Sequence, residues 1–292
     1  MTMTDFNANA PYTAISYVVD DGVATVTLNR PEARNGYTRT MADEAEQAFK
    51  AADRDPEVRV VVFTGAGKDF SVGADLSGGG FDLSSETDDP QTWQEPAGRC
   101  SKTIFAMNKP VIAALRGAAV GGGLTITLSC DFRLASTDSR FGFMFGRRGI
   151  FPEGGSVWYL PRLVGMATAS DWMITGRVFD AEEALAAGLV RSLHAPEDVL
   201  AAAYELAREI IATTSPVSTA VIRQMLYRLS GLDSPMPAHA LDSRLIAGLA
   251  THADAVEGVT SFLEKRTPHF PMSVPGDIPA WLPWVSPDGP DV

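Results

Sequence analysis

Three consecutive glycines, Gly121-Gly122-Gly123, stand between two apolar runs and could open the backbone for chemistry. The run before them, Val111 to Leu115, follows a proline and is typical of a buried strand. The run after them, residues 124–130, stays apolar and suits a buried helix. Glycines at a helix start leave N–H groups uncovered at the positive end of the helix dipole. Such groups can stabilise a negative oxygen that develops during a reaction, although the same glycines could serve only close packing.

A second glycine-rich segment, residues 65–75, directly follows a run of β-branched residues. It is not a phosphate-binding loop, because Asp69 follows Lys68 where serine or threonine is required. It is not a dinucleotide fingerprint either, because Phe70 occupies the place of the third glycine. We interpret it as a turn after a buried strand, where the backbone lies open. The histidines lack metal-ligand spacing and no histidine motif accompanies the cysteines, so neither a metal nor a thiol nucleophile is predicted.

The elements that must position these turns read as an α/β arrangement. Residues 15–19 and 23–28 are predicted strands, and a helix is predicted from Thr38 or Thr40 to about Ala52. The continuous apolar run 58–64 predicts a central strand that is buried on both faces. Strand, helix, strand in this order indicates a layered α/β domain.

The second half of the chain is predicted to be largely helical, from about residue 167 to 266. Residues 269–292 are rich in proline and cannot form a helix, so we expect them to lie against the body or a neighbouring subunit by Trp281 and Trp284. Residues 77–96 combine glycine, serine and acids without a period. They predict a mobile or partly disordered loop, which could also serve as a lid or a pocket wall.

Composition narrows the classes of protein. A net charge of −12 over 292 residues argues against binding to nucleic acid or to an anionic membrane. Residues 111–130 carry one charge, Arg116, but the glycines and that arginine argue against a membrane helix. Two cysteines make no disulfide framework, and the first residues show no secretory pattern, so we expect a cytoplasmic protein.

Several segments stand in a shared order and spacing: Leu28-Asn-Arg-Pro31, residues 70–76, residues 108–124, Cys130-Asp131 and Leu160-Pro-Arg-Leu-Val-Gly165. Through them, roughly residues 12 to 266 resemble the crotonase (enoyl-CoA hydratase/isomerase) superfamily. The resemblance implies an α/β fold made as a crotonase-type spiral of ββα units. It implies a core with an acyl-CoA site over residues 1–200, and a helical oligomerisation region with a proline-rich tail over residues 201–292. It also implies a homotrimer or a hexamer (dimer of trimers), and coenzyme A as part of a thioester substrate with no prosthetic group.

Members of this superfamily hold the thioester oxygen between two backbone N–H groups. The resemblance places these groups on Ala74, after Gly73, and on Gly122, after Gly121. Both positions are also open backbone in the reading from the residues alone. Each such donor contributes roughly 2.7–4 kcal/mol to an enolate-like transition state.

The resemblance also bears on the proton-moving group. Typical hydratases of the superfamily use two glutamates, and their positions are taken here by Thr125 and Phe145. Neither side chain can act as a base near neutral pH, so addition of water by two carboxylates at these positions is not predicted. A carboxylate remains at Glu153, where several isomerases of the superfamily carry their working acid. One carboxylate that takes and returns a proton suffices for migration of a double bond, so the sequence favours an isomerase.

The surroundings of Glu153 support this role. Phe145, Phe151 and Trp158 predict an apolar acyl pocket, which would raise the pKa of Glu153 by removing it from water. Alternatively, Glu153 lies in the first turn of a helix, where the dipole favours it. Within the same fold, Glu153 could instead activate water for hydration or hydrolysis, or serve retro-aldol chemistry. A non-catalytic acyl-CoA-binding protein is the alternative of another class.

Two further residues complete the candidate substrate site. Arg34 falls where relatives place a basic residue near the coenzyme phosphates, although a solvated surface arginine fits equally well. Asp75 follows the Ala74 amide, and capping of a helix suits it better than chemistry.

Overall fold

A six-stranded sheet forms the centre of the computed structural model, which describes residues 12–79, 93–249 and 252–285. Its strand order is β1-β2-β3-β4-β6-β9. The first two strands pair antiparallel and all other neighbours pair parallel. The strands are β1 (Ile15–Asp20), β2 (Val23–Leu28), β3 (Val60–Gly65), β4 (Val111–Leu115), β6 (Phe132–Ser136) and β9 (Ser192–His194).

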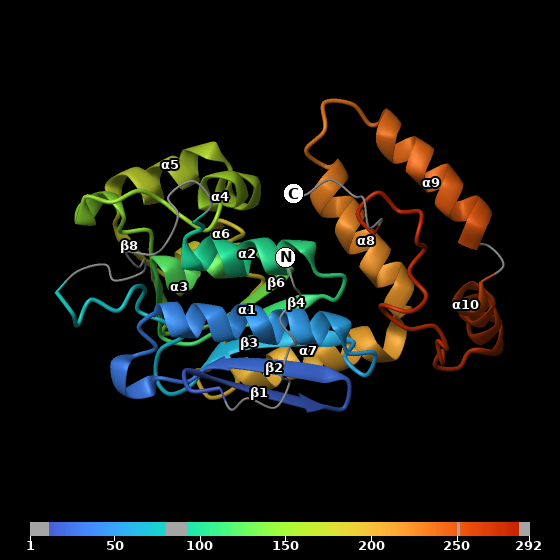
Figure 1. Cartoon of the computed structure of the whole chain (residues 1–292), viewed down its shortest axis with the longest axis horizontal. Coiled ribbons are helices and arrows are strands. Elements are labelled where there is room, and N and C mark those ends of the chain that lie inside the picture. Colours follow the sequence, from blue (N-terminus) through green and yellow to red (C-terminus); the bar gives the residue numbers. More distant parts are fainter. Residues whose placement is uncertain (1–11, 80–92, 250–251, 286–292) are drawn as a thin grey trace.

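Helices cover both faces of this sheet, which explains why β3 and β4 are apolar without alternation. On one face lie α1 (Arg39–Arg54) and α2 (Pro96–Ala106), and on the other lies α7 (Val199–Thr213) (Figure 1). Side chains of β3 alternate between the two layers, because Val61 and Phe63 face α1 and α2 while Val60 and Val62 face α7. The predicted two-sided burial of this strand is therefore confirmed.

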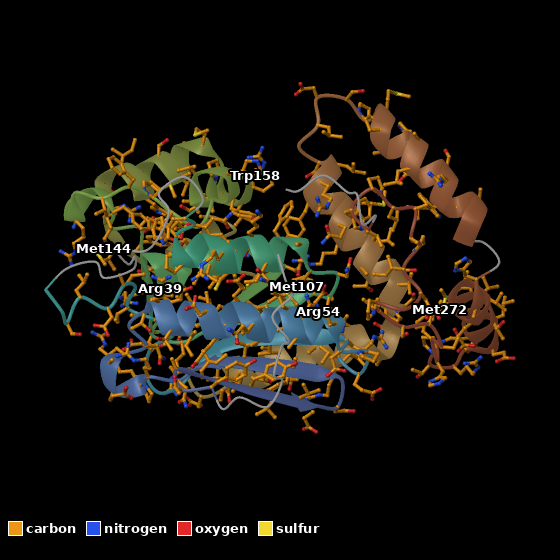
Figure 2. All side chains as sticks on the ribbon, viewed as in Figure 1. Arg39, Arg54, Met107, Met144, Trp158 and Met272 are labelled. Carbon is orange, nitrogen blue, oxygen red and sulfur yellow. The ribbon has the colours of Figure 1, made fainter. Side chains whose placement is uncertain are left out.

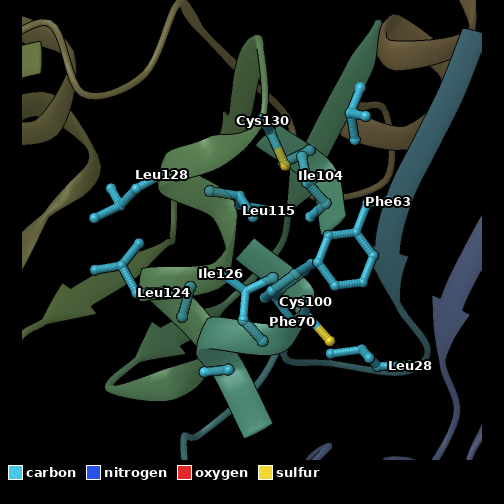
Figure 3. Packing of buried hydrophobic residues seen from close by; sticks show 14 of the residues in the cluster. Leu28, Phe63, Phe70, Cys100, Ile104, Leu115, Leu124, Ile126, Leu128 and Cys130 are labelled. Carbon is cyan, nitrogen blue, oxygen red and sulfur yellow. The ribbon is translucent and has the colours of Figure 1, made fainter. Parts of the chain in front are cut away.

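Aromatic rings fill the layer between the sheet and the helices α1 and α2. Phe63 meets Phe49 and Phe70 edge-on, with ring centroids 5.2 Å and 5.1 Å apart. Figure 3 shows Phe63 beside Cys100 and Ile104 of α2 in this layer. Burial of these side chains fixes α2 over the strand ends from which the glycine-rich segments leave.

A second, smaller sheet holds these segments together. Its strands, in the order β5-β7-β8, are β5 (Ala118–Val120), β7 (Arg140–Gly142) and β8 (Val178–Asp180). Ser71 forms a bridge with Ala119 of β5, and the Gly121 N–H donates to the Gly142 carbonyl at 2.9 Å. The small sheet therefore places the turn after β3 directly beside the triple glycine.

The helices outside the main layers mostly match the predicted ranges. The predicted helix over residues 124–130 starts two residues earlier and tightens to a 3₁₀ helix (Ile126–Ser129). Two further 3₁₀ turns cover Pro31–Ala33 and Gly146–Arg148. The other helices are α3 (Gly122–Thr125), α4 (Ser156–Val164), α5 (Met166–Thr175), α6 (Ala181–Ala186), α8 (Pro216–Leu229), α9 (Met236–Leu249) and α10 (Ala253–Glu264).

The last three helices stand to one side of the layered core (Figure 1). The predicted division at residue 200 falls at the start of α7, but α7 packs on the sheet, so the helical region that leaves the core begins with α8. Residues 265–285, the described part of the chain after α10, return across α8 and α9 without forming a helix. There Leu282 is fully buried, and Arg244 of α9 stacks on Trp281 with its guanidinium carbon 3.8 Å from the ring centre.

Two further expectations concern the loop over residues 77–96 and the absence of a membrane helix. Most of the predicted loop 77–96 lies outside the described residues, and α2 begins at its end. Across the described ranges, none of the helices has the length and apolar character that crossing a bilayer requires.

Candidate functional site

The turn after β3 includes an exposed backbone N–H, that of Ala74. The Tyr37 N–H donates to the Gly73 carbonyl at 2.7 Å, and the Asp75 N–H donates to the Tyr37 carbonyl at 3.0 Å. These bonds clamp the segment on both sides of Ala74, whose own N–H has no acceptor in the part of the chain that the structure describes. Gly73 has a φ of +84°, and a Cβ there would come within 2.9 Å of the Val120 carbonyl oxygen. Glycine is therefore required at this close crossing.

The triple glycine exposes a second N–H, that of Gly122. Gly121 has a φ of +51° and turns the chain from β5 into α3. Its carbonyl already accepts from the N–H groups of Leu124 and Thr125, each at 3.0 Å. The Gly122 N–H is bonded to no acceptor within the described segments. As the first residue of α3, it lies at the positive end of that short helix.

Both exposed amides border one cavity, which has about 730 Å³ of empty volume and opens to solvent. Most of its wall is apolar, which suits a ligand with a hydrophobic portion. Among the described residues, no three His, Cys, Asp or Glu side chains gather as metal ligands would. The lining residues are Tyr37, Val72, Gly73, Ala74, Leu76, Glu95, Pro96, Ala97, Val120, Gly121, Gly122, Met144, Phe145, Arg148, Ile150 and Glu153.

Glu153 brings a carboxyl group to the two amides. Its Oε1 accepts from the Thr125 hydroxyl at 2.6 Å and lies 3.6 Å from where a Cβ on Gly122 would stand. Its Oε2 is buried and has no hydrogen-bond donor among the described residues. Burial and the negative charge of Glu95 raise the pKa of Glu153 to about 8, and the Thr125 bond opposes this only in part. A carboxyl with this pKa can give up or take a proton near neutrality.

Glu95 is a second carboxyl in the cavity, and our sequence reasoning missed it. It caps α2, where its Oε2 accepts from the Gly98 N–H at 2.5 Å. Its Oε1 accepts from the Gly154 N–H at 2.8 Å, next to Glu153 in the chain. The available signal was a glutamate immediately before a proline and an apolar helix, a pattern typical of a helix start. From the sequence alone, this glutamate falls in the irregular loop predicted over residues 77–96.

Thr125 and Phe145, which the resemblance aligns with the glutamates of typical hydratases, both contribute to the site. Thr125 does not border the cavity, but its hydroxyl holds Glu153 from behind. Phe145 is buried and forms part of the apolar wall. Neither supplies a titratable group near neutral pH.

The other candidate residues lie outside the cavity. Arg34 is exposed, and its Nε donates to Asp69 at 2.7 Å. Asp75 pairs with Arg30 at 2.9 Å and accepts from the Ser77 N–H at 3.0 Å, which lowers its pKa to about 2. It thus caps a turn and not a helix.

Two of the three aromatic residues expected around Glu153 also point elsewhere. Phe151 is 87% exposed. Trp158 lies in the first turns of α4 and packs edge-on against Phe105 of α2, in a groove behind the cavity. Figure 2 shows Trp158 well apart from Met144, which lines the cavity. Gly154 and Gly155, both with positive φ, separate Glu153 from the start of α4.

Comparison with known proteins places this chain in a family. Residues 19–272 match the family model described as enoyl-CoA hydratase/isomerase. The chain therefore belongs to the enoyl-CoA hydratase/isomerase family, the crotonase superfamily, and the predicted fold class is confirmed.

The relatives include both hydratases and an isomerase by name. The chain is 38% identical over 251 residues to the enoyl-CoA hydratase ACTT3 of Alternaria alternata, covering 86% of this chain and 83% of the relative. It is 32% identical over 258 residues to the 1,2-epoxyphenylacetyl-CoA isomerase of Escherichia coli, covering 86% and 96%. Among solved structures, an enoyl-CoA hydratase from Polaromonas sp. JS666 superposes with a TM-score of 0.81 at 29% identity, covering 88% of this chain and all of that one.

Proposed function

We propose that this protein is an acyl-CoA enzyme that moves the double bond of an enoyl-coenzyme A thioester. The thioester oxygen would rest between the N–H groups of Ala74 and Gly122, and Glu153 would exchange a proton with a carbon of the acyl group. The observation that carries this proposal is the position of the Glu153 carboxyl, which borders the same cavity as both amides and adjoins Gly122.

The two amides suit an enolate more than a neutral carbonyl. Both are rigidly held, and no group within the described ranges competes for either N–H. A negative oxygen gains more from such donors than the carbonyl of the bound substrate does, so the interaction lowers the barrier as well as binding the substrate. The apolar wall beside them supports an acyl chain as the occupant.

The reaction balances as follows for a 3-enoyl thioester. A proton leaves carbon 2, and its electron pair forms the double bond of an enolate while the carbonyl π pair moves to oxygen. The electron pair on oxygen then re-forms the carbonyl, and the enolate double bond shifts to lie between carbons 2 and 3. The π pair that joined carbons 3 and 4 takes a proton at carbon 4. A carboxyl near the reacting carbons contributes about 10²–10⁴-fold to such proton transfers.

Substitution of Glu153 tests the proposal. We expect wild-type protein to convert 3-enoyl-CoA to an isomer of unchanged mass, and Glu153→Gln to lower kcat by at least about 100-fold while coenzyme A thioesters still bind. Chromatography with mass spectrometry identifies the product, and calorimetry measures the binding. Glu182→Gln is the matched control, because Glu182 is an exposed glutamate in the first turn of α6. Undiminished turnover by Glu153→Gln contradicts the role, and binding without any conversion by wild type indicates a non-catalytic acyl-CoA-binding protein.

Addition of water to a 2-enoyl thioester is the second candidate function. The observation that favours it is Glu95, which gives the cavity a second carboxyl despite Thr125 and Phe145. Incubation with 2-enoyl-CoA distinguishes the reactions, since hydration yields a product heavier by one water.

We also propose that the protein works as a homotrimer or a hexamer made of two trimers. Support comes from large apolar side chains that lie exposed on the last three helices. A single copy leaves them in water, and burial against another copy would remove that cost. Sedimentation velocity tests this proposal, and a monomer at micromolar concentration contradicts it. The side chains are Ile222, Leu226, Ile246, Val256, Val259, Phe262 and Leu263.

A further inference from the structure

The hydrogen bonds that Glu95 accepts suit a carboxylate anion. Its two carboxylate oxygens accept from the backbone N–H groups of Gly98 and Gly154, at 2.5 Å and 2.8 Å. Its position as the N-cap of the eleven-residue helix α2 adds the positive end of that helix dipole. Charge-assisted bonds of this kind stabilise the ionised form of a carboxyl.

The buried surroundings of Glu153 suit a carboxyl group that keeps its proton. One oxygen accepts from the Thr125 hydroxyl, and the other is buried without a donor in the described part of the chain. The Glu95 carboxylate lies beside it, because Glu95 Oε1 accepts from the N–H of Gly154, the next residue in the chain, and its negative charge acts on Glu153. Two adjacent carboxylates on this mostly apolar wall repel each other, so one of them keeps a proton. Glu153 must carry it, because Glu95 already has two amide donors.

We propose that Glu95 is a second catalytic carboxyl, which shares one proton with Glu153 and acts as the base while Glu153 acts as the acid. This inference rests on the proposed function and assigns the roles within it. The resting enzyme would then hold both a proton acceptor and a proton donor against the same acyl group. Both carboxyls border the cavity of the Ala74 and Gly122 amides, as this division of roles requires.

The proton balance closes within the pair. For a 3-enoyl thioester, the Glu95 carboxylate takes the proton from carbon 2 as the enolate forms on the two amides. Glu153 then gives its proton to carbon 4 as the double bond forms between carbons 2 and 3. Glu95 is left protonated and Glu153 ionised, and transfer of one proton from Glu95 to Glu153 restores the starting state. Water addition uses the same pair, with water as the proton source for Glu95 and carbon 2 as the acceptor from Glu153.

Two other titratable side chains lie beside the pair of carboxyls. Tyr37 and Cys100 are buried beside it, and burial holds the pKa of Tyr37 well above its ordinary value and that of Cys100 near 12. Both therefore stay neutral. Arg148, exposed at the cavity wall, is the one cation among the described lining residues.

The test compares Glu95→Gln with wild type in two measurements. The first is the infrared band of a protonated carboxyl, taken as the difference from Glu153→Gln in unliganded protein. In wild type this band should disappear as the pH rises through about 8. In Glu95→Gln it should disappear at lower pH, because the neighbouring charge is gone and the new amide can donate to Glu153. The glutamine oxygen can still cap α2, and loss of the Glu95 charge moves the band whether or not Glu95 takes part in turnover, so the band tests the coupling of the two carboxyls and the second measurement tests catalysis.

The second measurement is the pH profile of kcat/KM. We expect wild-type activity to fall above pH 8, where Glu153 loses its proton, and Glu95→Gln to lose at least about 100-fold in kcat. If Glu153 acted alone as the base, it would have to be ionised, and activity would instead rise toward pH 8. Asp180→Asn is the matched control, since Asp180 is an exposed N-cap on α6 that does not line the cavity. This variant should behave as wild type.

Gly98→Ala is a second variant that keeps both carboxyls. A Cβ on Gly98 would stand 1.9 Å from Glu95 Oε1, so the Glu95 side chain must move away. Alanine suits the helix, and the variant should shift the band and lose activity in the same direction as Glu95→Gln. An unmoved band in both variants, or near-normal turnover by Glu95→Gln, overturns the inference. If wild type converts no enoyl thioester, the proposed function fails, and the infrared titration still decides whether the two carboxyls share a proton.

Discussion

A buried carboxyl without a full set of partners is costly to ionise, and Glu153 is such a group. Its Oε2 has no donor among the described residues, and Glu95 adds a negative charge beside it. The protein tolerates this cost where a proton must be exchanged, as is typical of functional sites.

The cost can be measured as a pH dependence of stability. Burial raises the folded-state pKa of Glu153 to about 8, from about 4.5 in the unfolded chain. Its favourable contribution is therefore complete below pH 4.5 and is lost as the pH rises through 8. We expect Glu153→Gln to match wild type near pH 4.5 and to be more stable by roughly 2–4 kcal/mol above pH 8. Urea unfolding across this range measures the difference, and parallel stability curves would contradict a displaced pKa.

At the residue scale, the sequence predicted one carboxyl and not the other. Glu153 was identifiable because it is the one acid in a short apolar and glycine-rich segment. Glu95 follows an acidic segment without periodicity, and only the folded chain brings it to Gly154. Its role depends on a contact over 59 positions, which no local pattern encodes.

At the scale of elements, two turns are held at a fixed distance by very short strands. The predicted longer strands and helices follow from burial on one or both faces. Strands of three residues, such as β5 and β7, carry too few positions for a period, so the sequence analysis missed them. They exist because their partners, which are far away in the chain, supply the hydrogen bonds.

Neighbouring glycines in α3 should respond differently to alanine. A Cβ on Gly123 would come within 2.5 Å of the Ser71 side chain, so Gly123→Ala should destabilise the fold by about 1–3 kcal/mol. A Cβ on Gly122 has only ordinary contacts, the nearest 3.6 Å from Glu153 Oε1, but it would stand in the cavity. Gly122→Ala should therefore keep its stability and lose about 10²-fold in kcat/KM.

Thermal unfolding and steady-state kinetics on the two variants check this contrast. Gly78→Ala is the control, because a Cβ there meets no atom within 4 Å. Equal effects of Gly122→Ala and Gly123→Ala on stability would contradict the assignment of Gly122 to the cavity.

At the scale of the whole molecule, α2 joins the site to the C-terminal helices. Its start carries Glu95, and its end is bound by Arg223 of α8. The Arg223 guanidinium donates to the carbonyls of Ile104, Phe105 and Met107 and to Asp131 at 2.8 Å. The sequence predicted α8 as a helix, but this buried attachment is visible only when both ends of the contact are folded.

Loss of this attachment should destabilise the whole chain. Arg223→Met removes the buried cation that pairs with Asp131, and among the described residues only Val111 N–H and Gln224 would still donate to Asp131 and to the carbonyls of Phe105 and Met107. Loss of one partner of a buried ion pair typically costs about 3–5 kcal/mol. Denaturant unfolding measures this loss. Arg266→Met is the comparison, because Arg266 is an exposed arginine that pairs with Glu257 and Glu264 at the surface, and its loss should change stability little. A similar effect of both substitutions would contradict the anchoring role of Arg223.

The clamped segments around Ala74 and Gly122 have a consequence for isotope exchange. Their neighbours Tyr37, Asp75 and Gly121 each donate a backbone hydrogen to a carbonyl, and these deuterate slowly in a stable fold. Ala74 and Gly122 lack that protection, so the free protein should label at these two positions within a slowly labelled frame. A thioester bound in the cavity should slow deuterium exchange mainly at these two amides. Residue-resolved exchange with and without the thioester measures this change.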